Sequence, residues 1–508
     1  MTALDTLKRS AALAATTVTL SRKAGRARLT QELGSLHGLP EKLSQLLALG
    51  RLDTAQTRLD AFAGHGALPQ RKSRALLEKA FGPLDRTFAH VELKGLAASL
   101  GQVHRARLRD GRELALKLQY PGIADALRVD LAAFGALGRA ARRGYDLSSY
   151  RQTLGEMIER ELDYGLEAEA LMRFGELVAG DRDFVVPAVH PSLCRLDPRS
   201  GPPVLAMDWL EGLSLEDARQ LPLEARASAS RALVRWFLRS LLEWQLIHGD
   251  LHPGNLRFVP EGNRLRLGVI DFGCSHALDG GMAGGLRLLL EGVACDDRGG
   301  AERWLARYAA MGFSVELLRP IADRLAALTR VLLTPLLTPG TFDPAQWDLS
   351  ARLEGLLGDQ RMAFRVAAPS SFAFVTRAFV GLVQVLRVLD APVAWRPLFD
   401  EISARSNVSQ PSALALPQRA ATAAPRTVRS RSLRVTITRG TQSRVDLTFP
   451  AIAAEGLQGL VPPEIVPRLA PRGIDLAALE ARAASSEFTP GELFSLVEPD
   501  RMVRVWLE

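Results

Sequence analysis

The chain has 508 residues, of which 47% are hydrophobic and 24% are charged, a composition typical of a soluble globular protein with a sizeable core. Its formal net charge of +8, from 64 basic and 56 acidic residues, is mild and predicts no specific nucleic-acid partner. The three cysteines, at 194, 274 and 295, form no disulfide framework, which favours a reducing, cytoplasmic compartment.

The first 85 residues are rich in leucine and contain few β-branched runs, which predicts a helical N-terminal extension. Pro40 suits the first turn of an amphipathic helix in which Lys42, Gln45 and Leu49 share one face. The apolar run 10–20 is broken by threonines and lacks a cleavage site, so we interpret it as a helix and not as a signal peptide.

A β-sheet is predicted next, with strands at 90–94, 102–108 and 113–120. The segment between the first two strands consists of small residues that let backbone N–H groups approach a phosphate. Lys117 alternates with leucines along the third strand, so it faces away from the leucine core and towards that segment. The pattern predicts that Lys117 contacts phosphate, and the loop residues predicted to join it are Leu96, Ala97, Ala98 and Ser99.

Helices are predicted from residue 123 to about 178, and they contain a group of acidic side chains. Glu161, Asp163 and Glu167 lie within two turns of one another on one helix. They are either an ordinary charged face or a functional group. In the functional interpretation, one carboxylate pairs with Lys117 while the others help to hold a metal ion.

An apolar strand is predicted at 203–210, where a hinge could join two lobes. Asp208 and Leu210 are therefore candidate nucleotide contacts. A mainly apolar helix follows at 227–245. Its arginines recur every fourth residue, which indicates a solvated face, and they are Arg231, Arg235 and Arg239.

The most informative stretch runs from 246 to 274. Asp250 and Asn255 lie five residues apart, and Asp271-Phe-Gly follows a short apolar run predicted as a buried strand. In kinase-type phosphotransferases, one carboxylate orients the acceptor, while an amide and a second carboxylate hold Mg²⁺ against nucleotide phosphates. His248, Asp250 and His252 could instead form a metal cluster or be polar residues of an ordinary loop, but both alternatives leave the downstream motif unexplained. We therefore predict Asp250 as a catalytic residue and Asn255 and Asp271 as metal ligands.

Residues 279–400 are again predicted as helical. The apolar stretch 372–389 is interrupted by Arg377, Gln384 and Arg387, so no membrane-spanning helix is expected. Residues 406–432 lack periodicity and are rich in Ser, Ala, Pro, Gln and Arg, which predicts a linker. The final segment, 433–508, combines strand patterns with short helices and predicts a small separate module.

Taken together in this order, the motifs within about 30–400 resemble the ABC1 (UbiB/AarF/ADCK) family of atypical kinases. The alanine-rich loop at 96–106 and the lysine strand at 114–122 carry the resemblance, and the Glu-x-Asp motif and the catalytic and metal residues complete it. The resemblance implies an α+β, protein-kinase-like two-lobe fold. Its parts would be a helical N-terminal extension (1–85), a first lobe with a helical insert (86–212), a second lobe (213–405), a linker (406–432) and a small C-terminal α/β module (433–508).

The resemblance also implies an atypical kinase or ATPase that binds ATP and Mg²⁺ and supports isoprenoid-quinone or other lipid metabolism. Lys117 would contact the phosphates and pair with a glutamate, for which Glu167 is preferred over Glu161. Glu161 and Asp163 would help to hold the metal. The protein would be cytoplasmic, or peripheral to the inner face of a membrane through contact with a lipid or isoprenoid.

Two features leave other functions open. The family's Lys-x-Gly-Gln motif stands here as Lys42-Leu-Ser44-Gln45, with serine in place of glycine, although Lys42 and Gln45 are still expected to gate the cleft. A small-molecule phosphotransferase of the aminoglycoside or choline type fits residues 248–255 equally well. A nucleotide-switched lipid-binding scaffold without essential catalysis is the third hypothesis. The C-terminal module is similar to the domain that ends envelope-stress proteins of the YvlB/LiaX kind.

Overall fold

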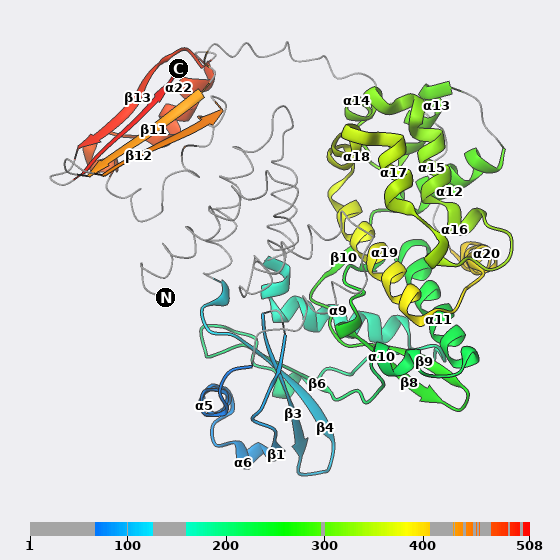
Figure 1. Ribbon diagram of the computed structural model, residues 1–508. Helices are drawn as coiled ribbons and strands as arrows, with labels where there is room; N and C mark the ends of the chain where they lie inside the picture. The colour runs from blue at the N-terminus through cyan, green and yellow to red at the C-terminus, as the bar shows by residue number, and fades with distance from the viewer. Residues whose placement is uncertain are drawn as a thin grey trace. The chain divides into compact units, whose positions relative to one another are not determined.

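The structure is a computed structural model in which the described residues form two compact units, one ending at residue 406 and the other beginning at 430 (Figure 1). The described residues are 67–98, 100–124, 159–295, 300–406, 430, 432–439, 443–450, 454, 457, 469–485, 488–497 and 501–508. Three predicted site residues, Lys42, Gln45 and Ser99, lie outside these ranges.

The first lobe is built on an antiparallel sheet in the order β1-β3-β4-β6, with the short β2 paired to β3. The elements are α5 (Gln70–Phe81), α6 (Leu84–Thr87), β1 (Phe88–Val91), β2 (Leu96–Ala97), β3 (Gly101–Leu108), β4 (Glu113–Gln119) and β6 (Val204–Asp208). Leu114, Leu116 and Leu118 pack against Leu77 of α5 in one core. Lys117 alternates with these leucines, as the sequence predicted, and projects from the opposite face of β4.

The helix α9 (Tyr164–Leu177) lies beside β6 of the first-lobe sheet. The second lobe then combines short strands with helices. Its first elements are β5 (Phe184–Val185), α10 (Leu215–Arg219), α11 (Leu223–Leu242), β7 (Leu246–His248), β8 (Leu256–Glu261), β9 (Arg264–Val269) and β10 (Ser275–Ala277). The strands pair as β5-β9-β8 and β10-β7. The loops between them carry the predicted catalytic and metal residues.

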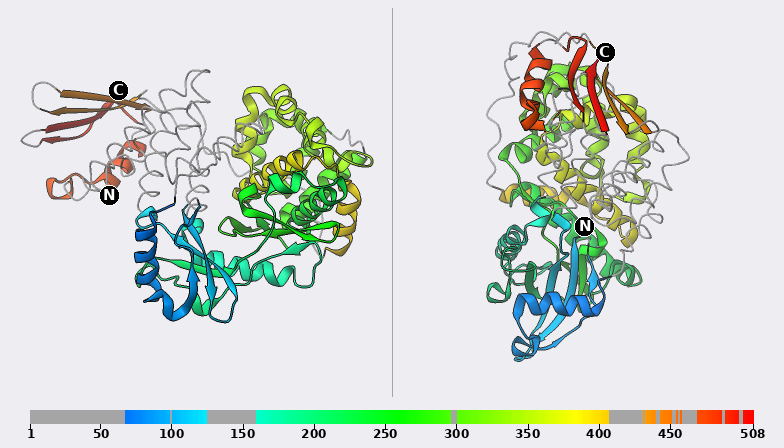
Figure 2. Two further views of the ribbon diagram at one scale, coloured as in Figure 1. Left: turned by 60° about the horizontal axis from the view of Figure 1, so that its bottom comes forward. Right: turned by 90° about the vertical axis from the view of Figure 1, so that its left-hand side faces the viewer.

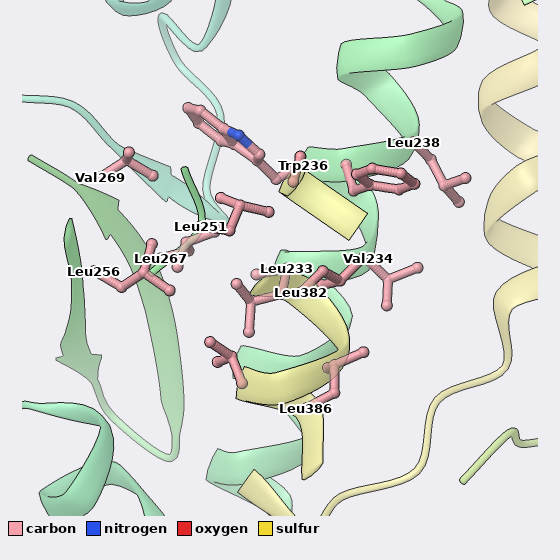
Figure 3. Packing of buried hydrophobic residues seen from close by; sticks show 14 of the residues in the cluster. Leu233, Val234, Trp236, Leu238, Leu251, Leu256, Leu267, Val269, Leu382 and Leu386 are labelled. Carbon is pink, nitrogen blue, oxygen red and sulfur yellow. The ribbon is translucent and has the colours of Figure 1, made fainter. Parts of the chain in front are cut away.

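Helices complete the second lobe (Figure 2). They are α12 (Gly280–Ala294), α13 (Gly300–Ala310), α14 (Val315–Leu318), α15 (Leu325–Leu332), α16 (Thr334–Leu337), α17 (Leu349–Leu357), α18 (Arg361–Ala367), α19 (Ser370–Leu389) and α20 (Trp395–Arg405). The helix α19 packs against α11. Their leucines lie in one core with Leu251 of the predicted catalytic segment (residues 246–255), as Figure 3 shows for Leu233, Leu382 and Leu251. The core of the lobe therefore lies directly behind the catalytic segment.

Among the described residues, α19 is the one helix long and apolar enough to cross a membrane by length and composition. Half of that stretch is buried inside the protein, and one such helix is weak evidence for a membrane span. The prediction that the arginines of α11 form a solvated face is wrong in part. Arg235 contacts Asp183, and Arg239 lies 2.5 Å from Asp181, so both guanidinium groups join α11 to the chain before β5.

The unit that begins at residue 430 contains an antiparallel sheet in the order β12-β11-β14-β13. Its elements are β11 (Ser432–Arg439), β12 (Ser443–Pro450), α22 (Leu476–Ser485), β13 (Gly491–Val497) and β14 (Arg501–Leu507). Leu433, Val505 and Leu507 of the sheet form one core with Leu476 and Ala483 of α22. Strand patterns corresponding to β11, β12 and β14 and two short helices were predicted here, whereas the strand β13 was not.

Candidate active site

Lys117 lies between two carboxylates that come from different parts of the chain. Its Nζ donates to Glu167 Oε1 at 2.7 Å and Oε2 at 2.9 Å, and to Asp271 Oδ2 at 2.9 Å. Lys117 belongs to β4, Glu167 to the first turns of α9, and Asp271 to the segment after β9. The sequence left open which glutamate pairs with Lys117, and in the structure it is Glu167.

Burial and charge oppose each other in this group. Burial by itself lowers the pKa of Lys117, but Asp271 and Glu167 outweigh it and raise that pKa well above its usual value. Burial raises the pKa of Glu167 to about 7, against the opposing effect of the Lys117 charge. The ammonium therefore remains charged and holds α9 and the Asp271 segment on β4.

Asp163 and Glu161 lie at the start of α9 in different environments. The Asp163 carboxylate accepts hydrogen bonds from the backbone N–H groups of Gly165 at 2.8 Å and Leu166 at 3.2 Å, which makes Asp163 the N-cap of the helix. Glu161 Oε1 lies 3.6 Å from Nη1 of Arg377. The metal roles predicted for Asp163 and Glu161 stay predictions, and the structure assigns Asp163 a capping contact.

The predicted catalytic segment, residues 246–255, is held in place by the buried side chain of His248. The Nε2–H of His248 donates to the carbonyl of Asp271, and its Nδ1 accepts from the backbone N–H of Asp250 at 3.4 Å. Burial lowers the pKa of His248, consistent with a neutral ring that donates on one side and accepts on the other. His248 thus fixes the relative positions of Asp250 and Asp271.

The amide nitrogen of Asn255 donates to both the carbonyl oxygen and Oδ2 of Asp250, each at 3.2 Å. These bonds bring together two residues that the sequence placed in one motif. Because the nitrogen makes them, the amide oxygen is the atom left to serve as a metal ligand.

Sequence reasoning missed Arg377. Nη2 of Arg377, from the apolar helix α19, lies 2.9 Å from Oδ2 of Asp250. In the sequence, Arg377 is an interruption of an apolar stretch. A charged residue inside such a stretch is rarely buried unless it is paired, and that signal could have marked it as part of a site.

Aromatic side chains pack around Phe272, the residue that follows Asp271. The Phe272 ring lies 5.0 Å from the Phe174 ring of α9 and 5.2 Å from the His248 ring, measured between centroids. Phe174 in turn stacks on Trp236 of α11 at 5.3 Å. The backbone N–H of Phe272 donates to Glu167 at 3.3 Å. Asp271 is therefore fixed by packing as well as by its ion pair.

The alanine-rich loop and the hinge lie at the edges of the site. Leu96 is 57% exposed, and the backbone N–H of Ala98 donates to the carbonyl of Gly101 at 2.9 Å. At the end of β6, Asp208 lies 2.7 Å from His190 Nε2. The side chain of Leu210 packs beside Gly268. The contacts seen among the described residues do not join Asp208 or Leu210 to the Lys117 group.

The donor set suits a metal ion that arrives with a nucleotide. The described residues contain no group of three or more His, Cys, Asp or Glu side chains placed to hold a metal. Mg²⁺ is commonly held by one or two carboxylates together with substrate phosphates and water. Asp271 and Asn255 supply the carboxylate and amide oxygens that Mg²⁺ prefers, so they fit a phosphate-bound ion better than a closed metal cage.

Comparisons with known proteins find similarity to atypical kinases. Residues 65–303 match the model of the ABC1 atypical kinase-like domain. The rat protein "Atypical kinase COQ8B, mitochondrial" is 26% identical over 386 residues, which cover 74% of this chain and 71% of the rat protein. The Arabidopsis thaliana "Protein ACTIVITY OF BC1 COMPLEX KINASE 1, chloroplastic" is 34% identical over 217 residues, which cover 40% of this chain and only 30% of that protein.

Among solved structures, the Rv3197–erythromycin complex from Mycobacterium tuberculosis is similar, with a TM-score of 0.50 and 28% identity. The similarity covers 76% of this chain and 97% of that one. The expected α+β, protein-kinase-like fold is confirmed. No comparison supports the likeness of the C-terminal module to YvlB/LiaX-type domains.

Proposed function

We propose that the chain is an atypical kinase or ATPase that binds ATP with Mg²⁺, because its residues 65–303 match the model of the ABC1 atypical kinase-like domain. The observation that carries the proposal is the position of Lys117, whose Nζ lies within 2.9 Å of both Glu167 and Asp271. An ammonium group held in this way is pre-positioned for nucleotide phosphates, because its charge and direction are set before the ligand binds.

The proposal gives each remaining residue a role. Lys117 binds the α/β-phosphates, and the loop 96–99 covers them. Asp271 and Asn255 hold Mg²⁺, which neutralises charge on the phosphates when it is bound. Asp250 orients the acceptor hydroxyl or water, and Arg377 keeps its carboxylate in place. Glu161 and Asp163 are secondary candidates for metal contact, Asp208 and Leu210 for the nucleotide, and Lys42 and Gln45 for gating the cleft.

The proposal extends to lipid metabolism and to a cytoplasmic protein that contacts a membrane surface peripherally. The names of the relatives identify a mitochondrial and a chloroplastic kinase and mention neither lipid nor membrane, so this part of the proposal rests on the charge of the chain. The net charge of +8 is compatible with anionic lipid headgroups.

The test is Mg²⁺-dependent ATP hydrolysis by the full chain, with and without anionic liposomes. The variants are Asp271→Asn and, as a matched control, Glu224→Gln, which changes an exposed carboxylate of α11. We expect slow hydrolysis that liposomes increase, that Asp271→Asn abolishes and that Glu224→Gln preserves. Equal hydrolysis by Asp271→Asn and the native chain would contradict the proposal. A rise in Tm with nucleotide but no hydrolysis would favour the switched scaffold instead.

A small-molecule phosphotransferase is the second candidate. The observation in its favour is that a similar Mycobacterium tuberculosis protein has a solved structure in complex with erythromycin, a ligand that bears hydroxyl groups. Transfer of ³²P from ATP to erythromycin, lost in Asp250→Asn, would support this candidate. Label that appears only in inorganic phosphate would exclude erythromycin as the acceptor.

A further inference from the structure

A second polar network lies inside the first lobe, and none of the roles proposed above uses it. Ser73, Gln102 and His104 each have 0% exposure. They come from α5 and β3, next to the apolar cluster of Leu77 and Leu114. Burying so many polar atoms costs free energy unless every one is hydrogen-bonded. The network therefore calls for an account beyond core packing.

The hydrogen bonds of Gln102 define the network. Its Oε1 accepts from the backbone N–H of Leu68 at 2.8 Å. Its Nε2 donates one hydrogen to Ser73 Oγ and the other to His104 Nε2, both at 2.8 Å. Because His104 Nε2 accepts, the proton of the ring lies on Nδ1, which donates to the carbonyl of Glu92 at 2.8 Å. Burial lowers the pKa of His104, which agrees with a neutral ring.

This network lies next to residues 96–97, in the part of the alanine-rich loop that is proposed to cover the phosphates. Ala97 of β2 pairs with Gln102 of β3, so these residues lie beside the strand that carries the network. Gly95 lies against the His104 ring, since a Cβ atom there would be 3.0 Å from the ring carbon Cε1 and 3.2 Å from Gln102 Cδ. The carbonyl of Glu92 holds the chain where it enters the loop. The entry to the loop is thus held by a hydrogen bond at one point and by close packing at another.

We infer that Gln102 and His104 are positioning residues that fix the alanine-rich loop for contact with nucleotide phosphates. This inference rests on the proposed function, which gives the loop its ligand. Backbone N–H groups stabilise phosphate most when their positions are set in advance. The bond to Leu68 extends the link to the residues just before α5. An apolar pair could fill the same space, but it would not specify the position of Glu92.

Two variants distinguish the hydrogen bonds made by the two ring nitrogens of His104. His104→Asn places an amide N–H near the position of Nδ1 and keeps the donor to Glu92. His104→Gln places its amide near Nε2 and loses that donor. The measurement is the Kd of ATP and of adenosine by calorimetry, with Mg²⁺ and the full chain. Leu84→Ala, which truncates a core leucine of the same lobe, is the control for general destabilisation.

We expect His104→Gln to weaken ATP binding about tenfold and to leave adenosine binding unchanged, because adenosine lacks the phosphates that the loop would contact. His104→Asn should stay close to the native chain for both ligands. Leu84→Ala should lower Tm without changing the ratio of the two Kd values. The inference is overturned if His104→Gln only lowers Tm, or if His104→Asn loses as much ATP affinity as His104→Gln.

Tryptic cleavage after Lys94, an exposed residue two positions before the loop, tests the inference without any nucleotide. Cleavage should be faster in His104→Gln than in the native chain, Leu84→Ala or His104→Asn. If the native chain failed to bind ATP, the proposed function would fail, while this cleavage pattern would still decide whether His104 orders the loop. Equal cleavage in all four proteins would overturn the inference.

Discussion

Arg377 Nη2 lies 2.9 Å from Asp250 Oδ2, although the two residues are far apart in sequence. Nη1 of the same guanidinium lies 3.6 Å from Glu161 Oε1, and the Arg377 side chain is 6% exposed. One buried cation from the apolar helix α19 therefore lies beside both the catalytic segment and the residues that precede α9. The pair joins the back of the second lobe to the candidate active site.

Arg377→Met should lower the free energy of unfolding by about 3 kcal/mol, because it removes the cation beside carboxylates that are largely withdrawn from water. Arg377→Lys should cost less, since it keeps the charge but loses the forked geometry. Urea denaturation measures the difference. Arg396→Met on α20 is the control, because its ion pair with Asp400 is about half exposed and should contribute less than about 1 kcal/mol. Equal losses at the two positions would contradict this interpretation.

Through Glu167, ATP affinity and the free energy of unfolding should change with pH in opposite directions. Its pKa is raised to about 7, so between pH 7 and its ordinary value of 4.5 the folded state binds more protons than the unfolded state. Through this group alone, acidification across that window raises the free energy of unfolding, and raising the pH lowers it. Protonation also weakens the bond to Lys117, so ATP affinity should fall as the pH drops below about 7.

Calorimetric titration with ATP across this pH range, for the native chain and Glu167→Gln, tests the prediction. The native chain should show an additional loss of affinity that Glu167→Gln lacks. Titration of ATP itself is common to both proteins and cancels in the comparison. Parallel pH profiles for the two proteins would show that Glu167 does not titrate in this window.

Gly101→Ala should be strongly destabilising. A Cβ atom at Gly101 would lie 2.9 Å from the Tyr164 hydroxyl and 2.2 Å from the carbonyl oxygen of Leu118, a backbone atom that cannot move without disturbing β4. Gly175→Ala is the matched control, because no atom outside its own helix lies within 4 Å of the new methyl group. It should raise the free energy of unfolding by about 0.5–1 kcal/mol through helix propensity. Thermal unfolding that moves both variants in the same direction would contradict this account.

Substitution of Asp163 separates its capping contact from the metal role predicted from sequence. Asp163→Ser keeps an oxygen that can accept from Gly165 and Leu166 but removes the charge, whereas Asp163→Ala removes both. If capping is its main role, Asp163→Ala should cost about 1 kcal/mol and Asp163→Ser much less, with Mg²⁺ dependence unchanged in both. A higher Mg²⁺ requirement in Asp163→Ser would support the metal role instead.

The features that local sequence specifies were predictable. The position of Lys117 follows from alternation along one strand, and the spacing of Asp250, Asn255 and Asp271 follows from one contiguous stretch. The two-lobe fold followed from the order of such motifs.

Contacts between distant segments were not predictable in the same way. The pairing of Arg377 with Asp250, and of Arg235 and Arg239 with Asp183 and Asp181, depends on how helices pack. Periodicity alone assigned Arg235 and Arg239 to a solvated face. The same limit applies to Gln102 and His104. Both alternate along a strand, but the chain that supplies their partners comes from outside the sheet.

The central claim is that Lys117, Glu167 and Asp271 form a site for ATP and Mg²⁺. Calorimetric titration of the full chain with ATP, in Mg²⁺ and in EDTA, tests it most directly when the native chain is compared with Asp271→Asn and Glu224→Gln. We predict that Mg²⁺ strengthens ATP binding in the native chain and in Glu224→Gln, and that Asp271→Asn loses this enhancement. Equal ATP binding by the native chain and Asp271→Asn under both conditions would contradict the claim.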